Sequence, residues 1–207
     1  ERRSFLIDAG AQFHGYACDI TRTHAARDGD FKALIQAVDR VQQSLCAEVR
    51  PGLDYRELHL LAHQRLAGML REAGVIRIDA GKAVESGLSA VFFPHGLGHL
   101  LGLQVHDVGG FLRDKSGNTI DKPPGHPYLR LTRPLEQGFV VTVEPGVYFI
   151  DLLLAQARSN AALARDIDWA RVEQFRPYGG VRIEDDVAVT ASGHENLTRN
   201  AFARLAS

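Results

Sequence analysis

The chain has 207 residues, of which 45% are hydrophobic and 24% are charged, and its formal net charge is −1 at pH 7. These values are ordinary for one globular domain with a sizeable core, and they exclude the basic surface that is typical of nucleic-acid-binding proteins. No apolar run approaches the roughly eighteen residues that a membrane-spanning helix needs. Cys18 lies in an expected strand and Cys46 on an expected helix face, and we expect a reducing cytoplasm.

Two apolar segments at the start of the chain predict an antiparallel hairpin. Asp8 follows the first segment, Asp19 lies in the second, and glycines between them are typical turn residues. With the turn centred near Phe13 and His14, the two aspartates would face each other with Cβ atoms about 4.5–5.5 Å apart. Because like charges so placed destabilise a hairpin, the pattern predicts a cation between them.

Two amphipathic helices are expected next. Apolar residues recur at helical spacing over residues 31–49, and a proline-glycine pair then ends the pattern. The second helix is expected to begin after Asp54, a candidate N-cap with Glu57 three residues later, and to end at Gly74. We interpret both apolar stripes as parts of the core.

Three histidines, His95, His99 and His106, lie in a glycine-rich segment that covers residues 92–107. Glycine and proline disfavour a long helix here, so the spacing of His95 and His99 need not form a helical zinc motif. The glycines instead allow backbone to approach backbone or substrate closely. A lone histidine is more often a core or surface residue than a ligand, but beside several placed carboxylates we expect at least one ligand among the three.

The next segments alternate between loops and a strand. Residues 113–134 form a polar excursion that carries Arg130, and long loops of this kind are often functional. Residues 139–144 are apolar and β-branched, so Glu144 would be a buried carboxylate that needs a partner, a proton or a metal ion. Pro145 would end that strand. Residues 152–178 show no regular pattern, and we expect an irregular region.

The last expected strand covers residues 181–189, with Arg182, Glu184 and Asp186 on one face. The chain thus carries five potential metal ligands in the order Asp8, Asp19, His99, Glu144 and Glu184. Oxygen donors with a single imidazole suit divalent cations such as Mn²⁺, and four carboxylates hold more negative charge than one such ion needs. We therefore expect two ions that share bridging carboxylates.

Six ordered motifs resemble those of the dimetal peptidases with the pita-bread fold. They are residues 6–10, 15–23, 93–99, 105–107, 142–146 and 180–185, and the similarity extends from about residue 3 to residue 199. Within that family the chain is most similar to the bacterial branch that cleaves Xaa-Pro dipeptides, the prolidases. The resemblance implies a mixed α/β (α+β) fold in which helices cover a curved, mostly antiparallel sheet with a dinuclear metal site on its inner face.

The resemblance also implies which residues hold the two ions. Asp8 would bind one ion, and His99 and Glu144 would bind the other. Asp19 and Glu184 would bridge both ions. No ligand of the family's set is replaced in this chain.

Four further residues receive roles from the same resemblance. His95 and His106 would line the substrate pocket without binding metal, and His106 would hydrogen-bond the scissile carbonyl as it becomes tetrahedral. Arg130 matches an arginine that clamps the free carboxylate of a dipeptide. Arg182 matches an arginine that orients the bridging glutamate.

The implied reaction is hydrolysis of a dipeptide whose second residue is proline. Two ions would lower the pKa of a shared water and polarise the scissile carbonyl, while Glu144 would relay the proton to the leaving group. Mn²⁺ is expected, although the usual affinity order lets Zn²⁺ or Co²⁺ compete. The family implies a homodimer. We expect residues 1–207 to be a catalytic domain that lacks its N-terminal part, because the chain begins abruptly at Glu1 before a core strand.

Three alternatives share the fold. Aminopeptidase P has the same ligands but releases the N-terminal residue before proline from longer peptides, and a carboxylate clamp at Arg130 argues against it. Creatinase-like relatives use the fold without metal. Other relatives have lost catalysis and serve as nucleic-acid or protein-binding modules. The intact ligand set argues against these last two.

Overall fold

The computed structural model describes residues 2–205, so Glu1 of the abrupt start lies outside the described residues. Its elements follow in the order β1 (Ser4–Phe13), β2 (Tyr16–Ala25), α1 (Asp30–Cys46), α2 (Tyr55–Glu72), α3 (Ala80–Glu85), α4 (Leu88–Phe92), β3 (Val140–Val143), β4 (Gly146–Tyr148), α5 (Asp151–Ser159), α6 (Ala161–Ala164), α7 (Trp169–Phe175), η1 (Arg176–Tyr178), β5 (Gly180–Arg182), β6 (Asp185–Val189), β7 (His194–Asn196) and α8 (Leu197–Leu205). Within this part the strands pair antiparallel in three small sheets, ordered β1-β2, β3-β6-β7 and β4-β5. The mixed α/β character agrees with the expectation.

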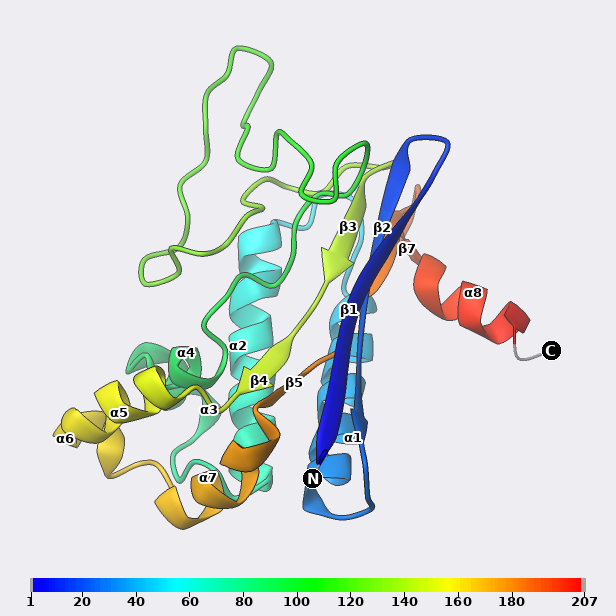
Figure 1. Ribbon diagram of the computed structural model, residues 1–207. Helices are drawn as coiled ribbons and strands as arrows, with labels where there is room; N and C mark the ends of the chain where they lie inside the picture. The colour runs from blue at the N-terminus through cyan, green and yellow to red at the C-terminus, as the bar shows by residue number, and fades with distance from the viewer. Residues whose placement is uncertain (1, 206–207) are drawn as a thin grey trace.

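Strands β1 and β2 form a long hairpin along one side of the molecule (Figure 1). His14 and Gly15 form its turn with φ of 49° and 87°. Two-residue hairpin turns of type I′ require such positive φ angles at both central residues. The turn lies one residue later than expected. The register therefore pairs Asp8 with Thr21, and the prediction that Asp8 and Asp19 lie directly opposite each other was wrong.

Helices α1 and α2 lie behind the hairpin and the central strands (Figure 1). Buried side chains recur every three or four residues along α1, which begins at Asp30 and ends at Cys46, earlier than expected. The Asp54 side chain caps α2 by accepting a hydrogen bond from the Arg56 N–H at 2.9 Å. Gly74 follows with φ 75°, as expected of a helix end. Since α1 contacts β2, β3 and β5, one core lies between helices and sheets.

Residues 152–178 are mostly helical, so the prediction of an irregular region was wrong. Asn160 and Asp168 cap α6 and α7 with their side chains, and Leu154 and Phe175 are buried. These helices are too short to show a clear sequence period, and packing against the core stabilises them.

Two strand breaks face each other in the centre of the molecule. The expected strand over residues 181–189 is divided into β5 and β6, and Glu184 in the gap forms an isolated bridge to Thr21 of β2. Glu144 lies in the matching gap between β3 and β4, where Pro145 ends β3 as expected. Strand β3 pairs with β6 and strand β4 pairs with β5. The gap that holds Glu144 therefore lies opposite the gap that holds Glu184.

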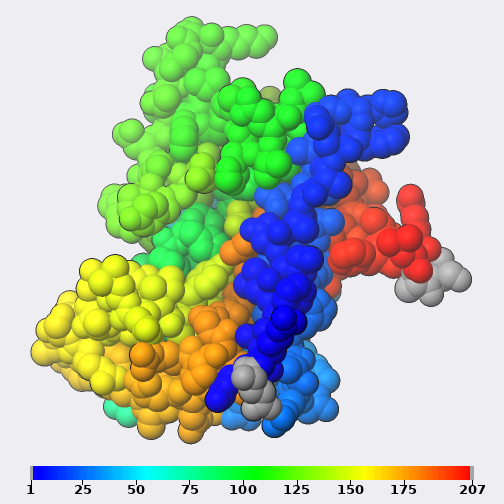
Figure 2. All heavy atoms as spheres, in the orientation of Figure 1, coloured from blue at the N-terminus to red at the C-terminus, as the bar shows by residue number. Residues whose placement is uncertain are grey.

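In Figure 2 the hairpin runs along one side of the visible face, the segment of about residues 100–134 projects beside and above it, and helices α5 to α7 fill the lower part of the other side. In the described part of the chain, no helix combines the length and apolar character needed to cross a membrane.

Candidate metal centre

Four of the five expected ligands lie together where β2, β3 and β6 meet. Asp19, His99 and Glu184 are buried, and each offers a donor atom within 4.8 Å of the others. Nε2 of His99 lies 3.6 Å from Oδ2 of Asp19 and 3.6 Å from Oε1 of Glu144. We call these four residues the carboxylate centre.

Asp8 lies at the edge of this centre and is half exposed. Its carboxylate accepts a hydrogen bond from Nη2 of Arg182, and its interaction with Asp19 helps to lower the pKa of Asp19. The structure therefore places Asp8 next to the expected ligands but pairs it with a cationic side chain. Arg182 also lies within 4.0 Å of both Glu144 and Glu184.

His99 is held in a fixed orientation by the neighbouring strand. Its backbone N–H donates to Oγ1 of Thr142 at 3.1 Å, and its Nδ1 lies 3.0 Å from the carbonyl oxygen of Leu100. This contact leaves Nε2 directed at the carboxylates, the arrangement usual for metal-binding histidines. A Cβ on Gly98 would lie 2.1 Å from the Thr142 carbonyl oxygen, so only glycine permits this approach.

The electrostatics of the centre favour a bound cation. Burial, followed by the charge of Glu184, raises the pKa of Glu144 well above its usual range. Burial also raises the pKa of Glu184 to about 7 and that of Asp186 to about 7. By contrast, a hydrogen bond with His99 lowers the pKa of Asp19. Closely packed buried acids of this kind need protons or cations, and the oxygen-rich donor set fits divalent ions.

Sequence reasoning missed two residues that link the centre to its surroundings. Thr21 donates from Oγ1 to Glu184 at 2.5 Å and accepts from Nε of Arg182 at 3.2 Å. The Tyr148 hydroxyl lies 3.0 Å from Nη1 of Arg182 and 2.9 Å from Nε2 of His95. A signal for Thr21 exists, because it is two residues from Asp19 and shares its strand face.

A cleft of about 670 Å³ opens beside the carboxylate centre. It is lined by His95, Gly96, Gly98, His106, Phe111, Lys122, Pro127, Tyr128, Arg130, Glu144 and Arg182. The ring of His106 stands edge-on to that of His99, with centroids 4.4 Å apart. Burial lowers the pKa of His95 to about 4, so its imidazole is neutral at pH 7. The structure thus gathers all of the expected substrate residues around one cleft that reaches Glu144.

A model of metallopeptidase family M24 matches residues 1–191. The chain belongs to metallopeptidase family M24. Xaa-Pro dipeptidases of Stenotrophomonas maltophilia (strain K279a) and Xanthomonas axonopodis pv. citri (strain 306) are each 59% identical to it over 202 residues, which is 97% of this chain and 45% and 46% of theirs. The chain therefore spans about half the length of these curated relatives.

Solved structures of related proteins show the same fold. Proline aminopeptidase P II from Yersinia pestis matches with a TM-score of 0.72 and 32% identity over 95% of this chain and 38% of its own. A variant of Escherichia coli aminopeptidase P in complex with substrate matches with a TM-score of 0.72 and 31% identity over 95% and 38%. The family membership and these structures confirm the predicted pita-bread fold.

Proposed function

We propose that this chain forms the catalytic part of a metal-dependent Xaa-Pro dipeptidase. The proposal rests on one observation: the same cleft is lined by Arg130, His95, His106 and Glu144. A cleft whose lining includes both a cationic side chain and the proposed ligand Glu144 suits a short substrate with a free carboxylate. Relatives named Xaa-Pro dipeptidase, at 59% identity, support the same assignment.

We further infer that residues 1–207 are part of a longer chain, because the relatives are about twice as long. A homodimer in the cytoplasm remains the predicted assembly and compartment. The free thiols of Cys18 and Cys46 are consistent with a reducing environment.

The ligand set proposed for two divalent ions consists of Asp8, Asp19, His99, Glu144 and Glu184. Asp19 and Glu184 would be shared, as the family resemblance implies; both are buried, and their donor atoms lie within 4.8 Å of each other. Mn²⁺ is the proposed metal, since carboxylate oxygens outnumber the single imidazole. When bound, two such ions supply a nucleophile from water at neutral pH and polarise the scissile carbonyl.

The protein's own groups would then move protons and hold the substrate. Glu144 would take the proton of the attacking water and pass it to the proline nitrogen, which carries no hydrogen of its own. Burial keeps the pKa of Glu144 high and nearby cations lower it, so the two effects bring it toward the pH range in which a relay works. His106 would donate a hydrogen bond to the developing oxyanion.

The substrate assignment can be tested with the complete Mn²⁺-loaded protein. Rates should be compared for an Xaa-Pro dipeptide, its C-terminal amide and an Xaa-Pro-Xaa tripeptide. If Arg130 pairs with the free carboxylate, Arg130→Ala should lose about 2–4 kcal/mol of the discrimination between acid and amide, as expected for a shielded charge-assisted contact. Arg113→Ala is the matched control, because Arg113 is exposed in the same excursion and does not line the cleft.

Metal content should stay unchanged in both arginine variants. Equal cleavage of the acid and the amide by the wild-type protein would show that the clamp does not exist. Aminopeptidase P activity would then be the better assignment.

A further inference from the structure

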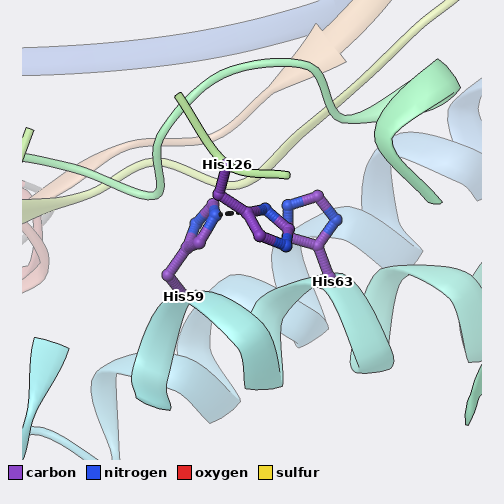
Figure 3. A group of neighbouring side chains, drawn as sticks. All are labelled: His59, His63 and His126. Carbon is purple, nitrogen blue, oxygen red and sulfur yellow. Dashed lines mark hydrogen bonds between the residues drawn. The ribbon is translucent and has the colours of Figure 1, made fainter. Parts of the chain in front are cut away.

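A second group of possible metal ligands lies outside the proposed catalytic machinery. His59 and His63 project from the same face of α2, four residues apart, and His126 reaches them from the excursion of residues 113–134 (Figure 3). Their three donor atoms lie within 4.8 Å of one another. We call these three residues the histidine cluster.

Two residues of the histidine cluster are fully buried and His126 is partly buried, and their ring nitrogens are only partly satisfied by hydrogen bonds. His59 and His63 are each 1% exposed. Nε2 of His59 lies 2.9 Å from Nδ1 of His126, and the three rings pack edge to face with centroids 4.5–4.7 Å apart. Nδ1 of His59 has no hydrogen-bond partner, although it is buried. The nitrogen of His59 that could bind an ion together with His126 is therefore Nε2, and the orphaned Nδ1 marks a ring that the protein alone does not satisfy.

The local chemistry selects a nitrogen-seeking cation. Nδ1 of His63 is held by Oγ of Ser89 at 2.9 Å, a contact that frees Nε2 to act as a ligand. Burial lowers the pKa of His59 to about 2 and that of His63 to about 3, so no proton competes at neutral pH. The cluster lines a cavity of about 180 Å³ with room for water, and no described residue that lines it is acidic. Imidazole donors without carboxylates suit Zn²⁺ far better than Mn²⁺.

We propose that His59, His63 and His126 bind one Zn²⁺ ion, with a water from the adjoining cavity as the fourth ligand. Tetrahedral zinc with Zn–N bonds of about 2.0–2.1 Å places its nitrogen ligands about 3.3 Å apart. Nε2 of His59 lies 2.9 Å from Nδ1 of His126, close to that value, and the donor atom of His63 lies within 4.8 Å of both. Small side-chain rotations therefore suffice to form the site.

Such an ion would tie the excursion of residues 113–134 to helix α2. His126 precedes Arg130 by four residues, and Pro127 and Tyr128 between them line both the cluster's cavity and the catalytic cleft. The zinc ion would thus fix the base of the loop that carries Arg130. It would act by ordering the segment and would not take part in hydrolysis.

The test counts ions in the complete protein after loading with Zn²⁺ and removal of the excess. In a background with Asp19→Asn and Glu184→Gln, which removes the two shared carboxylates, one Zn²⁺ per chain should remain. Adding His126→Asn should remove this ion. His24→Gln, which changes an exposed histidine of β2, is the matched control and should keep it.

Two further readouts use signals other than the ion count. Co²⁺ bound to the unaltered cluster should show the strong visible absorption of a four-coordinate site, and His63→Gln should abolish it. Zn²⁺ should slow amide exchange of residues 113–134 in the His24→Gln control but not after His126→Asn.

Retention of the ion in both His63→Gln and His126→Asn would overturn the proposal. Absence of Zn²⁺ and of the Co²⁺ absorption in the background protein would overturn it as well, and would leave the cluster as three packed neutral histidines. If His126→Asn does not fold, the Co²⁺ spectrum of the unaltered cluster decides the question.

Discussion

Burial shifts the pKa values of the carboxylate centre and of the histidine cluster in opposite directions. In the carboxylate centre, burial raises the pKa of Glu144 well above its usual range and that of Glu184 to about 7. In the histidine cluster, burial lowers the pKa of His59 to about 2 and that of His63 to about 3. Both shifts favour the neutral form, as desolvation requires. The direction of a shift therefore reports burial, and the donor atoms determine which cation each site can hold.

The two regions also differ in fixed charge. The guanidinium of Arg182 contacts Asp8, Glu144 and Glu184, so the carboxylate centre contains a permanent cation even without metal. The cavity beside the histidine cluster is lined by no acidic residue among those described. We therefore expect the carboxylate centre to hold oxygen-seeking ions and the cluster to hold a nitrogen-seeking ion. Variants that alter one region alone can test this contrast.

The largest effect is expected from loss of a shared carboxylate. Asp19→Ala or Glu184→Ala should remove both ions from the carboxylate centre and reduce dipeptide hydrolysis to the background rate, because each residue is proposed to contact both ions. Asp8→Ala should weaken mainly one ion, since Asp8 lies at the edge of the site. Metal analysis of the complete protein provides the measurement. A Glu184→Ala protein that keeps two ions in this centre would refute the shared role.

A smaller effect is expected from His106→Ala. This imidazole lines the cleft and stands edge-on to His99. If it stabilises the oxyanion, its removal should lower kcat by about 10²–10³-fold and change KM little. Steady-state kinetics, with His24→Gln as the control, separate the two parameters. A large change in KM at constant kcat would instead make His106 a substrate-binding residue.

Loss of the fixed cation should have a still smaller effect. Arg182→Met removes the contacts to Asp8, Tyr148 and Thr21 but leaves every proposed ligand in place. We expect metal affinity at the carboxylate centre to fall by about 10–100-fold, as is typical when a group that orients a ligand is lost. Zn²⁺ binding to the histidine cluster should not change. Equal weakening at both sites would point to general unfolding.

The last comparison concerns the pH dependence of stability in metal-free protein. The native pKa of Asp186 is raised to about 7. Its contribution to the free energy of unfolding is therefore present at low pH and is lost as pH rises from about 4 to 7. The native pKa of His63 is lowered to about 3, so its contribution is present above about pH 6.5 and is lost as pH falls toward 3.

Urea unfolding across this pH range measures both contributions. Asp186→Asn should reduce the loss of unfolding free energy that occurs as pH rises toward 7. His63→Gln should reduce the loss that occurs as pH falls toward 3. Each slope should change by up to about 1.4 kcal/mol per pH unit. His24→Gln should change neither slope. Identical slopes in all four proteins would contradict the opposed roles of burial in the two regions.

The sequence predicted features that depend on local spacing. The two long helices followed from apolar periodicity, and the Asp54 cap and Gly74 end were confirmed. The position of Glu144 at the end of a strand followed from Pro145. The predicted hairpin register was wrong, because moving the turn by one residue to His14 and Gly15 shifts every pair.

Features that depend on distant contacts were not predicted. The short helices between residues 151 and 175 are stabilised by packing, and their own sequence carries little period. In the histidine cluster, the spacing of His59 and His63 was visible on a predicted helix face. Their proximity to His126 depends on the path of a long loop, and no local pattern determines that path.

The most direct test of the central claim is a Mn²⁺ titration of metal-free, complete protein with an Xaa-Pro dipeptide as the substrate. We expect no turnover without metal, a rise in rate up to two equivalents of Mn²⁺ per chain, and no such rise in Glu184→Ala. Full activity of the metal-free wild-type protein, or an equal response of the Glu184→Ala variant, would contradict a hydrolytic centre built on these carboxylates.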